Sequence, residues 1–150
     1  MADTFTQILF HAVFSTKHRV PLIDAKLRAE LYPFMADTVR RHGGRLVALG
    51  GMPDHVHFLI RLKPYVPISS MVRFLKTNSS RWLGERPDLV KGFAWQTGYA
   101  AFSVSESNAE TVEAYILNQE SHHAKRSYER ELRSLLKRHR IPFDPSKILD

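Results

Sequence analysis

Two histidines, His55 and His57, alternate with apolar residues in a segment typical of a β-strand. Side chains two positions apart on a strand point to the same face, so the two imidazoles are expected side by side. Two neutral imidazoles placed in this way can bind a divalent metal ion. Taken alone, however, such a pair is more often two surface or hydrogen-bonding histidines. The pattern therefore leaves a metal site and a structural pair both open.

A second pair, Tyr115 and Gln119, lies four residues apart in a predicted helix, which puts both side chains on one helix face. A tyrosine hydroxyl can attack phosphorus when it is held in place and a metal polarises the phosphate. Gln119 offers a neutral oxygen ligand on the same face. Taken alone, such a tyrosine far more often packs its ring in the core. Together with the histidine pair, it predicts metal-dependent phosphoryl transfer.

Basic residues supply a candidate surface for a polyanion. Each cluster taken separately is more often a solvated face, but their number favours binding to nucleic-acid phosphates. The candidate DNA-binding residues are Lys17, Arg19, Arg73, Lys76, Arg81, Lys125 and Arg126.

The composition agrees with a small nucleic-acid-binding protein. The 150 residues carry a formal net charge of +7, and 43% of them are hydrophobic, enough for a core. The sequence has no cysteine, which excludes disulfides, thiolate metal sites and cysteine nucleophiles. No apolar run is long enough to span a bilayer, and the first residues do not resemble a secretory signal. We expect one domain over residues 1–150, a soluble intracellular protein, and no membrane partner.

The elements that must position these residues follow a regular order. The predicted strands cover residues 5–14, 45–49, 55–62 and 93–105 (one bent strand or two short ones), and the predicted helices cover 24–42, 68–83, 108–124 and 125–140. Asp24 is the expected N-cap of the first helix, and the Ser107 to Glu110 spacing predicts a capping box for the third. This order predicts an α+β, ferredoxin-like split βαβ fold: an antiparallel sheet with two helices on one face and the other face free for a site.

Four segments are similar, in order and in spacing, to the motifs of the single-tyrosine HUH transposases of bacterial insertion sequences. The segments run from His11 to Arg19, from Met52 to Ile60, from Trp95 to Val104 and from Tyr115 to His123. The similarity covers about residues 5–125 and leaves a basic helical C-terminal segment over about 126–150. Each motif is weak by itself, whereas four in register are specific.

The resemblance implies an enzyme that cleaves and rejoins single-stranded DNA through a 5′-phosphotyrosine. Tyr115 would be the catalytic nucleophile, and His55, His57 and Gln119 would bind Mg²⁺ or Mn²⁺. It further implies DNA partners with hairpins at the ends of an element, and a homodimer in which the tyrosine helix of one subunit completes the site of the other. On this resemblance, we expect a cytoplasmic protein of a bacterium or archaeon.

Three alternatives remain. A domesticated transposase of repetitive palindromes shares the motifs but usually has a longer C-terminal extension. A non-enzymatic single-strand binder would need exposed aromatic residues on its central strands, whereas the strand of His55 carries none on the face of its histidines. A hydrolase of small phosphoesters would need a carboxylate or a further histidine near the pair. Asp54 is adjacent, but we expect its side chain on the opposite face of the strand.

Overall fold

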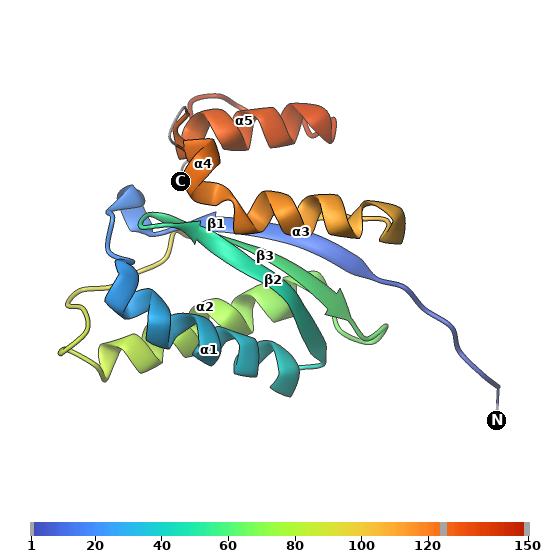
Figure 1. Ribbon diagram of the computed structural model, residues 1–150, viewed down its shortest axis with the longest axis horizontal. Coiled ribbons are helices and arrows are strands. Elements are labelled where there is room, and N and C mark those ends of the chain that lie inside the picture. The colour runs from blue at the N-terminus through green and yellow to red at the C-terminus, as the bar shows by residue number, and fades with distance from the viewer. Residues whose placement is uncertain (1, 124–125, 149–150) are drawn as a thin grey trace.

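The computed structural model describes residues 2–123 and 126–148, in which a four-stranded antiparallel sheet lies between two layers of helices (Figure 1). The strand order is β2-β3-β1-β4. The chain runs through β1 (Leu9–Ser15), the short 3-10 helix η1 (Lys17–Arg19), α1 (Ala25–Arg41), β2 (Gly44–Met52), β3 (His55–Leu62), α2 (Ile68–Gly84), β4 (Ala100–Ser103), the 3-10 helix η2 (Glu106–Asn108), α3 (Ala109–Leu117), α4 (Gln119–His123) and α5 (Tyr128–Arg138). The predicted ferredoxin-like α+β fold is confirmed.

The two central strands, β1 and β3, form the rigid base of the molecule. Every residue of β1 is buried, and in β3 only Arg61 is partly exposed. The strands pair antiparallel, with Val13 opposite His57 and Ser15 opposite His55. Because helices cover both faces of the sheet, the polar side chains of these strands other than Arg61 are removed from solvent.

Helices α1 and α2 cover one face of the sheet and enclose the main hydrophobic core. Phe10, Phe14 and Phe58 point into this core from the two central strands. Helix α1 begins where the sequence predicts, because the Asp24 side chain accepts a hydrogen bond from the Leu27 amide at 2.8 Å. Alternation along the strands therefore directs the other set of side chains, including the histidines, to the opposite face.

Helices α3, α4 and α5 cover that opposite face (Figure 1). The prediction of one helix from residue 108 to 124 is wrong in its middle, because Asn118 leaves the helical conformation and separates α3 from α4. Residue 124, its expected end, lies outside the described part of the chain. The predicted capping box is also wrong. The η2 turn makes Asn108 the residue before α3, so the Ser107 hydroxyl is out of position and contacts that of Ser105 instead.

The basic C-terminal segment folds back over the sheet instead of continuing the third helix. Helix α5 begins after Ser127, whose hydroxyl accepts a hydrogen bond from the Arg130 amide at 3.3 Å. Leu132, Leu135 and Leu136 form an apolar stripe on α5 that is buried against Val13 and Phe102. This return of the chain brings α5 to the face that carries the histidines.

The segment predicted as strand over residues 93–105 pairs over a shorter stretch. Only β4 joins the sheet there, together with an isolated bridge between Thr16 and Trp95. The intervening carbonyls of residues 96, 97 and 98 accept hydrogen bonds from the Lys76 ammonium at 2.8, 3.3 and 2.5 Å. Lys76 thus takes acceptors that a strand would use for pairing.

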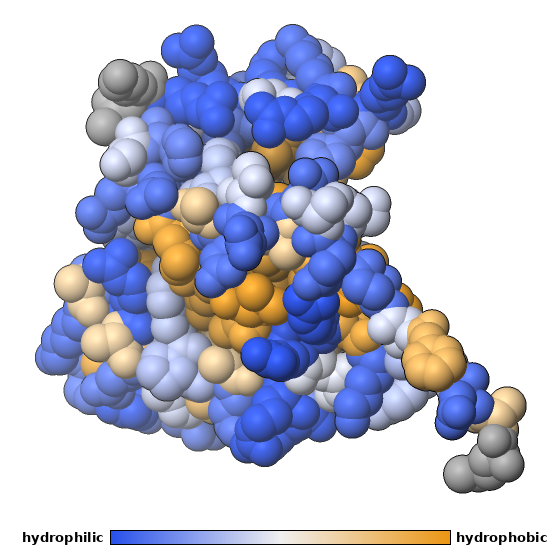
Figure 2. Space-filling model, turned by 45° about the vertical axis from the view of Figure 1, so that its right-hand side comes forward, coloured by the Kyte–Doolittle hydropathy of each residue, from blue (hydrophilic) through white to orange (hydrophobic). Residues whose placement is uncertain are grey.

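The polarity of the surface differs between the helical layers and the sheet. Hydrophilic side chains cover both layers, and apolar side chains gather between them at the level of the sheet (Figure 2). Within residues 2–123 and 126–148, none of the helices has the length and apolar character needed to cross a membrane.

Candidate metal centre and active site

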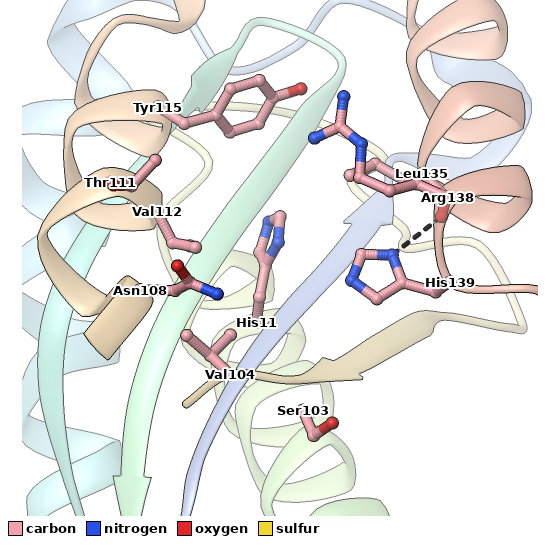
Figure 3. Close-up of a pocket in the computed structure, with 10 residues that line it drawn as sticks. All are labelled: His11, Ser103, Val104, Asn108, Thr111, Val112, Tyr115, Leu135, Arg138 and His139. Carbon is pink, nitrogen blue, oxygen red and sulfur yellow. Dashed lines mark hydrogen bonds between the residues drawn. The ribbon is translucent and has the colours of Figure 1, made fainter. Parts of the chain in front are cut away.

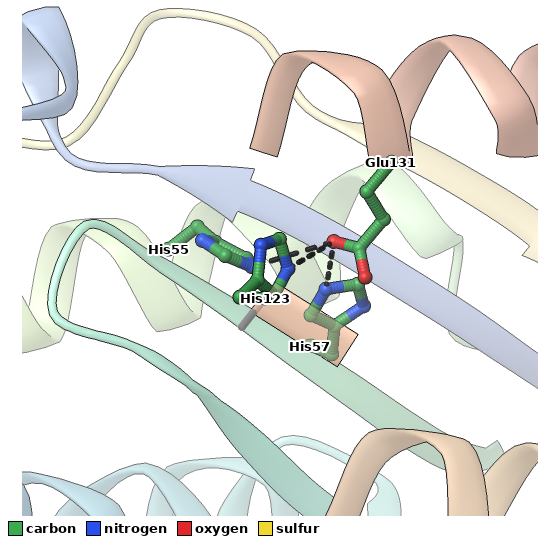
Figure 4. A group of neighbouring side chains, drawn as sticks. All are labelled: His55, His57, His123 and Glu131. Atoms are coloured by element: carbon green, nitrogen blue, oxygen red, sulfur yellow. Dashed lines mark hydrogen bonds and ion pairs between the residues drawn. The ribbon is translucent and has the colours of Figure 1, made fainter. Parts of the chain in front are cut away.

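Three imidazoles and one carboxylate converge on the upper face of the sheet (Figure 4). Glu131 of α5 is at the centre. Its Oε1 atom lies 2.8 Å from His57 Nε2, 3.1 Å from His123 Nε2 and 3.4 Å from His55 Nε2. His55 and His57 come from β3 and His123 from the end of α4. The side chains of His55, His57 and Glu131 have no solvent exposure.

The spacing and chemistry of these four residues fit a divalent metal ion. Their ligand atoms all lie within 4.8 Å of one another. Ligands about 2.0–2.2 Å from a central ion are at most ~4.4 Å apart, so small shifts of these side chains would let the cluster enclose one. Imidazole is a poor ligand for Mg²⁺ and a good one for transition metals. The four side chains are therefore a candidate site for a divalent metal ion.

Two further side chains fix the orientation of the β3 histidines. The Asp54 Oδ1 atom lies 2.7 Å from His55 Nδ1, and His11 Nε2 of β1 lies 2.8 Å from His57 Nδ1. Both histidines therefore direct Nε2 toward Glu131, as metal-binding histidines do when a partner holds the other nitrogen. The expectation for Asp54 is wrong. This residue belongs to the turn before β3, where strand alternation does not apply, and it reaches the histidine side.

The cluster is strongly coupled electrostatically. Burial lowers the pKa of His55, but its hydrogen bonds to Asp54 and Glu131 outweigh this and raise the pKa to about 9. Burial keeps the pKa of His57 below its ordinary value. Burial raises the pKa of Glu131, but its contacts with His123, His55 and His57 outweigh this and hold the pKa far below its ordinary value. An ionised carboxylate thus lies among donors that would bind a cation.

Tyr115 of α3 is joined directly to this cluster. Its hydroxyl donates a hydrogen bond to Glu131 Oε2, the carboxylate oxygen that does not face the histidines. Its ring lies 5.9 Å from that of His57 and 4.5 Å from that of His122, between ring centres. Burial and the negative charge of Glu131 raise the pKa of the phenol. The hydroxyl is therefore held close to the cluster in its protonated form.

Gln119, the first residue of α4, reaches the same place. Its side chain is buried, and Oε1 lies 3.3 Å from His55 Nε2. Its Nε2 donates to the Tyr115 carbonyl at 3.5 Å. The side chains of Tyr115 and Gln119 consequently both face the histidine cluster, despite the break in the helix at Asn118.

The predicted DNA-binding residues are distributed over both faces of the molecule. Lys17 and Arg19 follow the end of β1, where Ser15 pairs with His55, and Arg126 follows α4. Arg73 and Arg81 are exposed on α2, which covers the opposite face of the sheet. Lys76 is half-buried and bound to backbone carbonyls, and Lys125 lies outside the described residues.

Sequence reasoning missed His11, His123 and Glu131. Glu131 carried a usable signal, because it falls on the apolar side of a helix between Tyr128 and Leu135. A charged residue on a buried helix face needs a partner, so its position implies one. His11 and His123 gave no comparable signal, since isolated histidines occur in many buried positions.

Comparison with known families shows which family the chain belongs to. A model of the family described as "Transposase IS200 like" matches residues 4–119. The chain belongs to this family. Among IS200-like relatives, the ISDra2 transposase TnpA of Deinococcus radiodurans is 27% identical over 118 residues, covering 75% of this chain and 84% of the relative. The transposase of insertion sequence IS200 from Salmonella typhimurium is 26% identical over 124 residues, covering 79% and 81%.

Solved structures agree with this family assignment. A transposase crystal structure from Deinococcus radiodurans R1 has a TM-score of 0.63 at 28% identity and covers 79% of this chain and 95% of its own. A REP-associated tyrosine transposase bound to a REP hairpin has a TM-score of 0.57 at 16% identity, covering 77% and 70%. The second likeness shows a shared fold. The family model ends at residue 119, so His123 and Glu131 lie beyond it.

Proposed function

We propose that this IS200-like transposase cleaves and rejoins single-stranded DNA through a covalent bond between Tyr115 and a 5′ phosphate. One observation carries the proposal: the Tyr115 hydroxyl is hydrogen-bonded to Glu131, the carboxylate at the centre of the histidine cluster. A structural tyrosine also takes a hydrogen-bond partner when it is buried, but that partner need not belong to a metal-binding cluster. A nucleophile held beside a metal-binding cluster is the arrangement that phosphoryl transfer requires.

The reaction consists of two balanced transfers. In the first, the Tyr115 oxygen bonds to phosphorus, the bond from phosphorus to the 3′ oxygen breaks, the phenol loses its proton, and the leaving oxygen gains one. In the second, a 3′ hydroxyl of another strand end attacks the same phosphorus, and Tyr115 leaves and recovers a proton. The covalent link conserves the bond energy, so no nucleoside triphosphate is required.

His55 and His57, together with Gln119, His123 or Glu131, would hold the divalent cation. A cation there supplies positive charge that offsets the Glu131 carboxylate and polarises the scissile phosphate. Asp54 and His11 keep the two β3 histidines oriented. Glu131 holds the Tyr115 hydroxyl in place before the attack.

The proposed substrate is single-stranded DNA with hairpins. The net charge of +7 and the basic residues on both faces support a polyanionic partner. A structural neighbour described as a REP-associated tyrosine transposase is bound to a REP hairpin, which makes a hairpin the natural first substrate to test. The same neighbour keeps the domesticated transposase of repetitive palindromes as the second candidate function.

The remaining two alternatives are separated from the proposal in different ways, one by the geometry and one by experiment. A single-strand binder that stacks bases on its sheet needs an open sheet face, but α3, α4 and α5 cover the face that carries His11, His55 and His57 (Figure 1). A small-phosphoester hydrolase gains the carboxylate that it needs, because Asp54 and Glu131 both contact the histidines. Such a hydrolase would nevertheless leave no protein attached to DNA.

The homodimer with composite sites remains a proposal based on the family resemblance. The apolar side chains at the level of the sheet (Figure 2) form the kind of surface that oligomers bury, and Leu117 at the end of α3 is 61% exposed. Within this chain Tyr115 contacts its own Glu131. Mixing a Tyr115→Phe subunit with a His55→Ala, His57→Ala subunit should restore cleavage if sites form in trans. Heterodimers that form without activity would contradict exchange.

The deciding experiment is a search for the covalent adduct. The protein is incubated with single-stranded DNA from the flanks of its own gene and Mn²⁺, and the products are separated on a denaturing gel. We expect labelled DNA to migrate with the protein and to be released by protease. Persistent absence of an adduct on strands that bind would overturn the proposal.

A further inference from the structure

A cavity of about 330 Å³ lies beside Tyr115, between α3 and α5 (Figure 3). Ligand pockets in proteins begin at about this size. The cavity exists because the two helices pack on the sheet separately: α3 covers Leu9 and Leu59, whereas α5 covers Val13 and Phe102. The buried ring of His11, on β1, forms its floor between these two apolar clusters.

Polar side chains face this cavity from the residue before α3 and from the residue after α5. Asn108 makes no capping hydrogen bond with α3, and its amide points into the cavity (Figure 3). From the other side, His139 stacks on Phe102 with ring centres 4.2 Å apart and donates from Nδ1 to the Leu135 carbonyl. This contact uses Nδ1, so Nε2 is the ring nitrogen left to a ligand. The cavity therefore combines a flat ring, an amide and a second hydrogen-bonding nitrogen.

Arg138 supplies the positive charge at this cavity. Its side chain is exposed and extends from the end of α5 toward the Tyr115 hydroxyl (Figure 3). Within the described part of the chain it has no ion-pair partner. Guanidinium groups bind phosphate in a two-point geometry, so an unpaired one next to a nucleophile for phosphorus suits a phosphate.

We propose that this cavity binds the nucleotide directly 3′ of the scissile phosphate, with its base between Asn108 and His139 and its phosphate near Arg138. The inference rests on the proposed function, because that nucleotide is the one whose 5′ phosphate becomes joined to Tyr115. An unstacked base read by hydrogen bonds and by a flat side chain is the usual way in which proteins recognise a single nucleotide. The cavity would then give the cleavage position a base preference.

The test uses the four deoxynucleoside 5′-monophosphates, each of which carries the base, sugar and phosphate of the proposed ligand. Each is titrated into the full chain and followed by NMR, with chemical-shift changes at Asn108 and His139 and saturation transfer to base protons. We expect binding with unequal affinities for the four bases. Asn108→Ala should remove that inequality, and Arg138→Gln should weaken all four by about fivefold or more.

Lys137→Gln is the matched control for Arg138→Gln. Lys137 is the adjacent exposed cation on α5 and does not line the cavity. Its substitution therefore removes the same charge at a position outside the cavity. Nucleotides that bind wild type, Asn108→Ala and Arg138→Gln equally, or do not bind at all, would overturn the nucleotide cavity even where the covalent adduct forms. Failure of the proposed function is distinct, because no strand would then give an adduct whatever the titrations show.

Discussion

The Tyr115 hydroxyl and the Nε2 atom of His57 are bound to the two different oxygens of one carboxylate, that of Glu131. The nucleophile proposed for DNA cleavage and the histidine proposed for the metal are thus joined through a residue of α5. Helix α5 lies beyond the region that the family model matches, yet in this chain it supplies the carboxylate that contacts both groups.

Replacing Tyr115 with Phe should abolish the covalent adduct and leave DNA binding unchanged. The ring keeps its packing against His57 and His122, and only the oxygen is lost. Losing one hydrogen bond to Glu131 should lower the free energy of unfolding by about 1 kcal/mol. Adduct formation on denaturing gels and urea unfolding measure the two effects. An adduct that persists in this variant would assign the nucleophile to another tyrosine, such as Tyr128 or Tyr99.

Replacing Glu131 with Gln should destabilise the protein in metal-free buffer by about 3 kcal/mol. The change removes the buried negative charge that faces three histidines, and breaking a buried ion pair leaves its partners uncompensated. Glu129→Gln is the matched control on the same helix. Glu129 pairs with Arg133 at 2.9 Å with both side chains partly exposed, so its loss should cost about 0.5 kcal/mol or less.

Urea unfolding in EDTA, repeated with Mn²⁺, separates the roles of Glu131. A stabilisation by Mn²⁺ that is present in wild type and in Glu129→Gln but much reduced in Glu131→Gln is the result expected of a ligand. Equal unfolding free energies for the two glutamate variants in EDTA would show that the buried cluster contributes nothing to stability.

The features that follow from local rules could be predicted from the sequence. The contacts that form because α5 folds back over the sheet could not. The pairing of His55 with His57 follows from strand alternation, and the common side of Tyr115 and Gln119 follows from helix geometry. Glu131 reaches the cluster only because α5 folds back after Ser127, a tertiary event without a local pattern. The position of the Asp54 side chain was predicted wrongly because a local rule was applied too far. Strand alternation was extended by one residue into a turn, where it does not hold.

Lys76 should have a structural role, because it holds the segment of residues 96–98 in place. Replacing it with Met leaves three carbonyls without their donor and should lower the free energy of unfolding by about 1–3 kcal/mol. Lys76→Arg, which keeps the charge and the donors, is the conservative comparison. A Met variant as stable as wild type would show that water satisfies these carbonyls equally well.

The same residue predicts a pH dependence with a definite sign. Burial lowers the pKa of Lys76 from 10.5 to about 8, so between these values the unfolded chain binds more protons than the folded one. Stability from this group therefore rises with pH across that window and is lost as pH falls through about 8. The stability difference between wild type and Lys76→Met should accordingly be larger at pH 10 than at pH 7.5, as measured by urea unfolding. A difference that shrinks with pH would contradict the lowered pKa.

Gly50 permits the close approach of α3 to the sheet, and replacing it with Ala should impair both stability and cleavage. A Cβ atom at this position of β2 would lie 2.2 Å from the carbonyl oxygen of Ile116. Because that oxygen belongs to the backbone, a rotamer change cannot relieve the clash and α3 must move.

A displacement of α3 by Gly50→Ala would also move Tyr115, because Tyr115 directly precedes Ile116 on this helix. We expect a loss of about 1–3 kcal/mol in unfolding free energy and a fall in adduct formation of about a hundredfold, the scale set by a nucleophile displaced by ~1 Å. Gly84→Ala is the control, since a Cβ atom there meets no atom within 4 Å and should be neutral or slightly stabilising. Unfolding and adduct yield are measured for both variants. If Gly50→Ala retained full adduct yield, close seating of α3 on β2 would not be what positions Tyr115.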